Sequence, residues 1–133
     1  MINSNTIEEI KKLNKEVKQL IKENKITTDK KFDDDTLAHN IKQEIIQKAL
    51  LEGLHLEDCH LYPNNPDKKH KGKNYYCIYQ HKLFSILIEI NYIIISYFKK
   101  PAHITLFHIS MLNYGSEEQR RYKEIKKIIE PYP

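Results

Sequence analysis

Residues 92–111 read YIIISYFKKPAHITLFHISM, and this stretch decides the fold class. Apolar side chains dominate YIIISYF (92–98) and recur at about every second position of HITLFHISM (103–111), which is the period of a β-strand. A short Lys-Lys-Pro-Ala segment separates the two, and short connections of this kind join neighbouring antiparallel strands. The stretch therefore predicts two adjacent strands of an antiparallel sheet.

Two segments upstream carry the same period. KNYYCIYQ (73–80) reads as a strand in which Tyr75, Cys77 and Tyr79 share one face, so burial of Cys77 would place both tyrosines in the core. FSILIEI (84–90) is apolar at its even-numbered positions. We expect an antiparallel sheet of three to four strands. Residues 83–98 fit either one long strand or a hairpin that turns near Asn91.

Helical periodicity precedes and follows the predicted strands. Residues 6–24 place an apolar residue every three or four positions, and Thr6 with Glu9 fits a capping box. A second helix is expected from Thr36 to Glu52, with Asp35 as its cap and Gly53 in the left-handed position that ends it. The segments 25–35 and 54–73 are polar or proline-bearing and read as a connector and a loop.

A C-terminal helix is predicted after Ser116, with Gln119 completing its capping box and Pro131 stopping it. The order of two helices, strands and a last helix predicts an α+β fold with the helices packed on one face of the sheet. We expect a single domain, 1–133, made of a helical arm (1–24) and an α+β core (36–133). The narrow apolar stripe of the arm fits a helix that covers a sheet face or a short coiled coil.

Composition describes an ordinary globular chain of 133 residues with a net charge of +4. This small charge permits a polyanionic partner without demanding one. Two cysteines give no disulfide framework, no secretory leader pattern is visible, and polar residues interrupt the longest apolar run. We expect a cytoplasmic protein that does not associate with membranes.

Metal and two-histidine chemistry are both disfavoured by spacing. His55, Cys59, His60, His70 and Cys77 are zinc-ligand types but lack the close pairs that structural zinc sites use, so no metal site and no cofactor is expected. HITL (103–106) and HISM (108–111) resemble the repeated H-x-T-x signature of phosphoesterases. In a regular strand, however, His103 and His108 would point to opposite faces.

Residues 49–99 carry a resemblance to a known group of proteins. The segments ALLEG, LHLEDCHLYPNNP, KNYYCIY and ILIEINYIIISY resemble the core of small domains in the barnase–EndoU–colicin–RelE group of RNase toxins and their phage-encoded relatives. The resemblance implies an active site in which His39 is a helix histidine, Ser96 is a strand hydroxyl and Lys99 is a basic group at the end of a strand.

The leading hypothesis is therefore a metal-independent RNase-like hydrolase, a toxin or phage-type effector. RNA cleavage without metal needs a base, an acid and a cation on the phosphate. We expect His39, His81, Ser96 and Lys99 to supply catalysis. Nucleic-acid binding would fall to a basic loop and one aromatic residue: Lys68, Lys69, Lys71, Lys73 and Tyr79. The alternative is a non-catalytic factor, such as an inhibitor, immunity or phage accessory protein, that binds a cognate protein.

Overall fold

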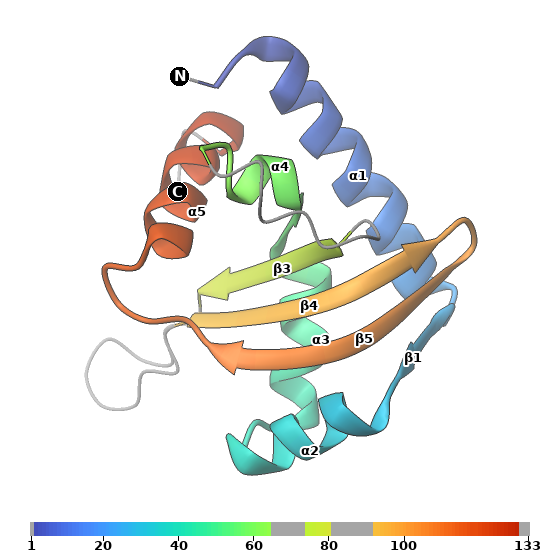
Figure 1. Ribbon diagram of the computed structural model, residues 1–133. Helices are drawn as coiled ribbons and strands as arrows, with labels where there is room; N and C mark the ends of the chain where they lie inside the picture. Colours follow the sequence, from blue (N-terminus) through green and yellow to red (C-terminus); the bar gives the residue numbers. More distant parts are fainter. Residues whose placement is uncertain (1, 65–73, 81–91, 131–133) are drawn as a thin grey trace.

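The computed structural model describes residues 2–64, 74–80 and 92–130, which form five helices and a five-stranded sheet (Figure 1). The elements in chain order are α1 (Ser4–Lys22), β1 (Ile26–Thr28), α2 (Lys30–Ala38), α3 (Gln43–Glu52), β2 (Leu54–Glu57), α4 (Asp58–Leu61), β3 (Asn74–Gln80), β4 (Tyr92–Lys100), β5 (His103–Met111) and α5 (Glu117–Ile129). The sheet order is β1-β5-β4-β3-β2. The α+β prediction is confirmed.

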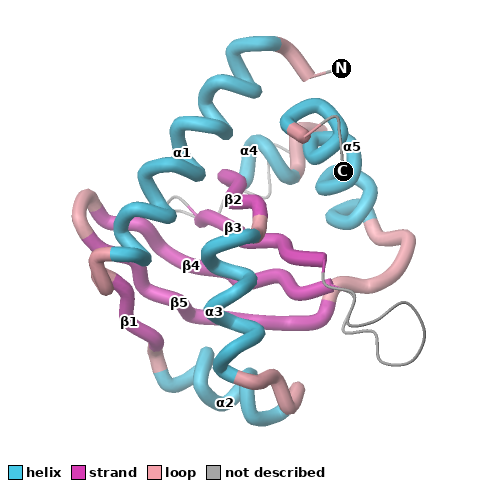
Figure 2. Tube along the Cα trace, turned by 180° about the vertical axis from the view of Figure 1, so that it is seen from behind, coloured by secondary structure: helices cyan, strands magenta, loops and turns pink. Residues whose placement is uncertain are grey.

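One face of the sheet is covered by α1 and α3, which cross it in the view of Figure 2. The apolar side of α1, including Val17, packs there with Ala49 and Leu50 of α3 and with Cys77 of β3 and Ile95 of β4. The first helix thus covers a sheet face and does not project as a coiled coil. We call this side the covered face.

Among the described residues, helices cover the opposite side at its β2–β3 end alone, so helices lie on both faces of the sheet and the expectation that they pack on one face is wrong. There α4 and α5 contribute Leu61, Tyr122 and Ile125 to a second apolar cluster, which includes Tyr76 and Ile78 of β3. The middle of this side, over β4 and β5, lies free of helices in Figure 1. We call it the open face, and it is where the polar side chains of the sheet gather.

The sheet differs from the prediction at both edges. β1 lies in the expected polar connector and pairs in parallel with β5, so the sheet is mixed. β2 lies in the expected loop and pairs antiparallel with β3. The outer edge of β2 is closed by Asn14 of α1, whose side-chain amide exchanges hydrogen bonds of 2.8 and 2.9 Å with the backbone of His55. Apolar periodicity could not reveal these short strands, because they span only three and four residues.

The expected second helix is two helices. α2 begins after Asp29, whose carboxylate accepts a 2.9 Å hydrogen bond from the Phe32 amide. It ends before Asn40, whose φ of 52° lies in the left-handed region that interrupts a helix. Asp35 therefore lies inside α2 and is not a helix cap. The predicted strand at 84–90 lies outside the described residues.

Helix termini show which capping predictions hold. Asn3 caps α1 by accepting a hydrogen bond from the Thr6 amide, one turn earlier than expected. Ser116 caps α5 as predicted, accepting from the Gln119 amide. Gly53 has a φ of −74° and not a left-handed backbone. Glycine is needed there for space, because a Cβ would lie 2.3 Å from the Ala49 carbonyl oxygen and 2.8 Å from the Cys77 sulfur.

A β-bulge interrupts the pairing of β4 with β5 where the register shifts between Ser96 and Tyr97. Ser96 pairs with His108, while Tyr97 pairs with Leu106, so Phe107 is the additional residue. The bulge reverses the alternation of β5. Leu106 and Ile109 both belong to the covered-face core, although they are three residues apart. His103 and His108 consequently lie on the same open face, and the expectation that they point to opposite faces is wrong.

Candidate functional site

Helix α2 is positioned by its attachment to β5. The Asp29 amide donates a 3.0 Å hydrogen bond to the Leu106 carbonyl, which extends the β1–β5 pairing up to the start of the helix. Phe32, one turn later, is only 2% exposed and anchors α2 to the core. Asp35 follows Phe32 by three positions and so lies on the same side of the helix. This side faces β5.

Asp35 meets His108 across this contact. The imidazole Nδ1 of His108 lies 2.7 Å from Oδ2 of Asp35, and both side chains are partly exposed. The hydrogen bond from His108 is the main cause that holds the pKa of Asp35 below its ordinary value. A carboxylate that accepts the Nδ1 proton leaves the lone pair of a neutral imidazole on Nε2. The described part of the chain provides no hydrogen-bond partner for that Nε2.

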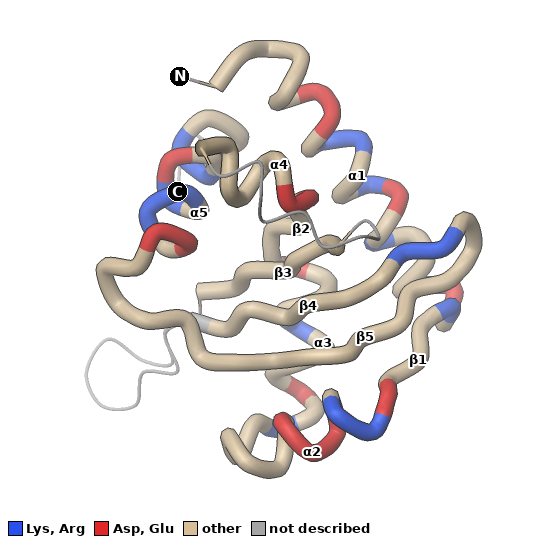
Figure 3. The backbone as a smooth tube through the Cα atoms, viewed as in Figure 1, with Lys and Arg blue, Asp and Glu red and all other residues tan. Residues whose placement is uncertain are grey.

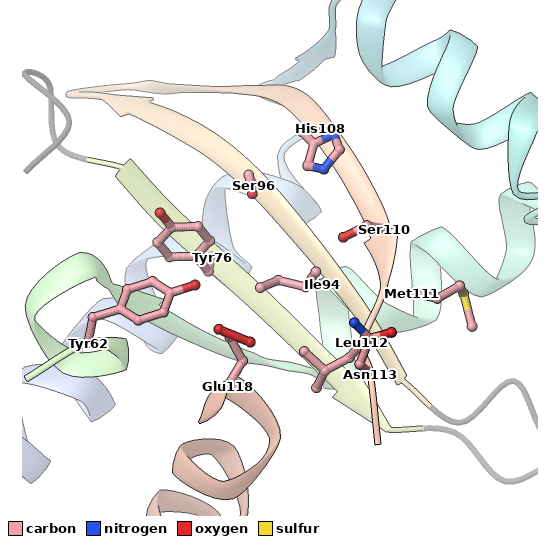
Figure 4. A pocket seen from close by; sticks show the side chains of 10 residues that line it. All are labelled: Tyr62, Tyr76, Ile94, Ser96, His108, Ser110, Met111, Leu112, Asn113 and Glu118. Carbon is pink, nitrogen blue, oxygen red and sulfur yellow. The ribbon is translucent and has the colours of Figure 1, made fainter. Parts of the chain in front are cut away.

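His108 belongs to a row of side chains that crosses the open face. Tyr76 of β3 pairs with Ser96 of β4, and Ser96 pairs with His108 of β5. Two adjoining hollows, of about 300 and 470 Å³, share these three residues. We call the combined hollow the sheet groove. Figure 4 shows the Ser96 and Ser110 hydroxyls and the His108 ring together on its strand floor.

One end of the sheet groove is basic and aromatic. It is lined by Lys31, Asn74, Phe98 and Phe107. The Phe98 and Phe107 rings stack with centroids 4.3 Å apart at 20°, and Phe98 is 42% exposed. Figure 3 shows basic residues at the start of α2 and at the end of β4, and neutral strands between them. This end offers a flat apolar surface beside a cation.

The other end is walled by α4 and α5. Tyr62 and Tyr76 meet edge to face, with ring centroids 5.9 Å apart, and Glu118 of α5 lies beside them (Figure 4). Burial raises the pKa of both phenols, and the neighbouring carboxyl groups of Glu118 and Asp58 raise the pKa of Tyr62 and of Tyr76, respectively. Both tyrosines therefore stay neutral near neutral pH and act as hydrogen-bonding walls.

Four of the residues predicted from the sequence can be placed, and the structure does not bring them together. Ser96 lies in the floor of the sheet groove. His39 is the exposed C-cap of α2 and does not line that groove. Lys99 points to the α1 side, where its ammonium lies 2.9 Å from Glu16. Tyr79 packs against the covered-face core, and its hydroxyl lies 3.5 Å from Glu52.

The remaining predicted residues lie outside the described residues. These are His81, Lys68, Lys69, Lys71 and Lys73. Their proposed roles in catalysis and nucleic-acid binding stay predictions.

His55 and Cys77, two of the potential metal ligands, are buried in the covered-face core. The His55 ring is held by the Tyr97 hydroxyl at 2.9 Å and the Leu50 carbonyl at 2.8 Å. Burial lowers the pKa of His55 to about 4. Burial raises the pKa of Cys77 to about 12, and its thiol donates to the Ala49 carbonyl. Both residues are packed and hydrogen-bonded parts of the core.

A second polar cluster lies outside the sheet groove, where β2 joins α4. Glu57, Cys59 and His60 place one potential metal-ligand atom each within 4.8 Å of the others. Sequence reasoning considered Cys59 and His60 but not Glu57. These three residue types could hold a divalent metal.

Asp35 and His108 are the site residues that sequence reasoning missed. The sequence pattern indicates a helix cap at Asp35, and a regular strand would turn His108 away from His103. A signal was present in the apolar positions 104, 106 and 109, whose spacing changes from two to three and marks a bulge. No sequence pattern indicated that α2 would lie against that position.

Comparisons with protein-family models, with curated proteins and with solved structures find no match for this chain. Among the described residues, no helix has both the length and the apolar character needed to span a bilayer.

Proposed function

We propose that this protein is a metal-independent ribonuclease that binds RNA in the sheet groove and uses His108 as its base. The observation that carries the proposal is the Asp35–His108 hydrogen bond of 2.7 Å at an open groove. A carboxylate that orients an imidazole and stabilises its protonated form is a recurring arrangement in acid–base catalysis. The RNase-toxin resemblance of residues 49–99 supports the same reaction class.

The residues fit the steps of RNA transesterification. His108 Nε2 takes the proton of a ribose 2′-hydroxyl, and the 2′-oxygen attacks the adjacent phosphorus. The bond from phosphorus to the 5′-oxygen breaks, and the leaving oxygen takes a proton from the solvent to which the groove is open. Lys31 lines the same hollow as His108 and offsets the charge that builds on the phosphate oxygens. Asp35 stabilises the imidazolium that forms.

The aromatic end of the groove supplies a place for a base. Sequence-tolerant binding of single strands commonly uses exposed aromatic rings on which unpaired bases stack. Phe98 presents such a ring beside His108, backed by Phe107. We therefore expect unpaired RNA to be cleaved in preference to duplex RNA.

The test is cleavage of a labelled single-stranded RNA by purified protein in EDTA. The products are analysed for a 2′,3′-cyclic phosphate at the cleaved end. His108→Ala is expected to lower the rate by about 10²–10⁴-fold. Asp35→Asn should also lower it, because a neutral amide neither fixes the imidazole tautomer nor stabilises its cation. His103→Gln is the matched control, since His103 lies on the same face and strand but bonds to Thr27.

Two results would contradict this assignment. The first is the absence of RNA cleavage by the wild-type protein at any stoichiometry. The second is cleavage by His108→Ala at the wild-type rate. A loss of RNA cleavage in His39→Ala or His81→Ala alone would instead assign catalysis to the residues expected from the sequence.

The alternative function is capture of a protein partner by the same groove. Its supporting observation is the exposure of Phe98 and Met111, which are 42% and 36% exposed and line the two hollows. Two results together would favour this alternative. One protein co-purifies in stoichiometric amount with the wild type but not with Phe98→Asp, and the wild-type protein does not cleave RNA.

A further inference from the structure

The junction of β2 and α4 concentrates metal-ligand side chains on one short segment. Glu57 ends β2, and Cys59 and His60 lie in the single turn of α4. Their potential ligand atoms lie within 4.8 Å of one another. Glu9 of α1 also reaches the cluster, with its Oε2 3.3 Å from Nε2 of His60. Four groups of the types that bind zinc therefore converge from two elements distant in sequence.

We propose that Glu9, Glu57, Cys59 and His60 form a tetrahedral zinc site. This inference does not rest on the proposed ribonuclease activity. Bonds of about 2.0–2.1 Å from zinc to nitrogen and oxygen and about 2.3 Å to sulfur give tetrahedral edges of roughly 3.3 Å between nitrogen and oxygen atoms and roughly 3.6 Å to sulfur. The 3.3 Å contact between Glu9 and His60 Nε2 matches such an edge. Oε2 of Glu57 lies 3.9 Å from His60 Nε2 and 3.8 Å from the Cys59 sulfur, so these two edges must shorten by roughly 0.2–0.6 Å.

The side chains differ in how firmly they are held. The His60 side chain is only 4% exposed, and the His60 carbonyl accepts a 2.6 Å hydrogen bond from Arg121 of α5. Glu9 is 65% exposed and can swing toward the ion. Cys59 is exposed, so an ion can reach the site from solvent. The buried imidazole and the exposed Glu9 carboxylate thus give the site one firmly held and one adjustable ligand.

The carboxylate of Glu57, 3.8 Å from the Cys59 sulfur, favours a cation at this point. A divalent ion that binds the sulfur releases the thiol proton to solvent. The Glu57 amide donates to His60 Nδ1 at 3.2 Å, so the neutral ring carries its proton on Nε2. Binding zinc at Nε2 moves that proton to Nδ1 and opens this contact, which reduces the affinity of the site.

The ion would join α1 to the β2–α4 junction. Four protein ligands leave no open position, which is typical of a structural site and not of a catalytic one. Asp58, between the ligands, interacts with the Tyr76 hydroxyl at the wall of the sheet groove. Zinc would therefore stabilise one wall of the groove without taking part in the chemistry there.

The test is titration of the metal-free full-length protein with Co²⁺ and then Zn²⁺. We expect one equivalent of Co²⁺ per chain, a thiolate-to-cobalt charge-transfer band, its loss on adding Zn²⁺, and a higher Tm with zinc. Cys59→Ser should abolish the band, weaken zinc binding by about tenfold or more, and remove the zinc-dependent rise in Tm. It retains Cys77, so it also excludes that thiol as the ligand.

The carboxylate from α1 is tested by a matched pair of variants. Glu9→Gln should keep the band but weaken zinc binding, whereas Glu8→Gln, at the neighbouring exposed position, should bind as the wild type does. A cobalt complex without the thiolate band, or wild-type affinity in Cys59→Ser, overturns the site. Equal affinities of Glu9→Gln and Glu8→Gln overturn the part assigned to α1.

Discussion

His55 makes the stability of this fold depend on pH in a defined window. Its ring is fully buried, with Nε2–H donating to the Leu50 carbonyl and Nδ1 accepting from the Tyr97 hydroxyl. The neutral ring satisfies both nitrogens in this arrangement, whereas a second ring proton would require the Tyr97 hydroxyl to turn from donating to accepting. Burial accordingly lowers the pKa of His55 from 6.5 to about 4.

The sign and size of the effect follow from linkage. Below pH 6.5 the unfolded chain gains a proton at His55 that the folded protein does not, so unfolding becomes more favourable as the pH falls. The contribution of neutral His55 to the free energy of unfolding is fully present above pH 6.5. It decreases by about 1.4 kcal/mol per pH unit as the pH falls, and it is lost near pH 4. The loss is about 2 kcal/mol at pH 5 and about 3 kcal/mol at pH 4.

The assay is urea unfolding from pH 7.5 to 4, comparing the wild type with His55→Gln. The variant should be less stable at neutral pH, because glutamine cannot reproduce both buried hydrogen bonds. Between pH 6.5 and 4 its free energy of unfolding should fall less steeply than that of the wild type. The difference in slope corresponds to the uptake of up to one proton fewer on unfolding. His39→Gln, which changes an exposed histidine, is the matched control and should keep the wild-type slope. Parallel curves for wild type and His55→Gln would refute the assignment.

Three further perturbations test the packing and the groove. Gly53→Ala should destabilise the fold by about 1–3 kcal/mol in urea unfolding, because its Cβ would meet the Ala49 carbonyl. Gly115→Ala should cost about 1 kcal/mol, because φ at this position is 76°, although nothing lies within 4 Å of the added Cβ. Lys99→Met should cost no more than about 1 kcal/mol, and less in high salt, because its partner Glu16 is 46% exposed. Phe98→Leu should weaken binding of single-stranded RNA by about 1–3 kcal/mol in fluorescence anisotropy, with duplex RNA affected less.

The sequence predicted the strands β3, β4 and β5, since each is at least seven residues long and rich in apolar and aromatic residues. It also predicted the helical character of α1, α3 and α5. It missed β1 and β2, which are held by pairing to neighbours and, at β2, by the distant Asn14. The break between α2 and α3 depends on the Asn40 backbone, which apolar periodicity does not register.

The candidate site was harder to predict because it depends on one extra residue in β5. Without the bulge at Phe107, the alternation set by Ile104 and Leu106 would turn His108 toward the covered face, and Ser96 would face a different neighbour. Ser96 was expected to be a site residue, and it lies in the groove; its partners in the groove were not foreseen. Asp35 reaches His108 only because β1 pairs with β5 and carries α2 to that edge. The site therefore arises from a register shift within the β4–β5 pair and from edge pairing, and the edge pairing brings together segments about 70 residues apart.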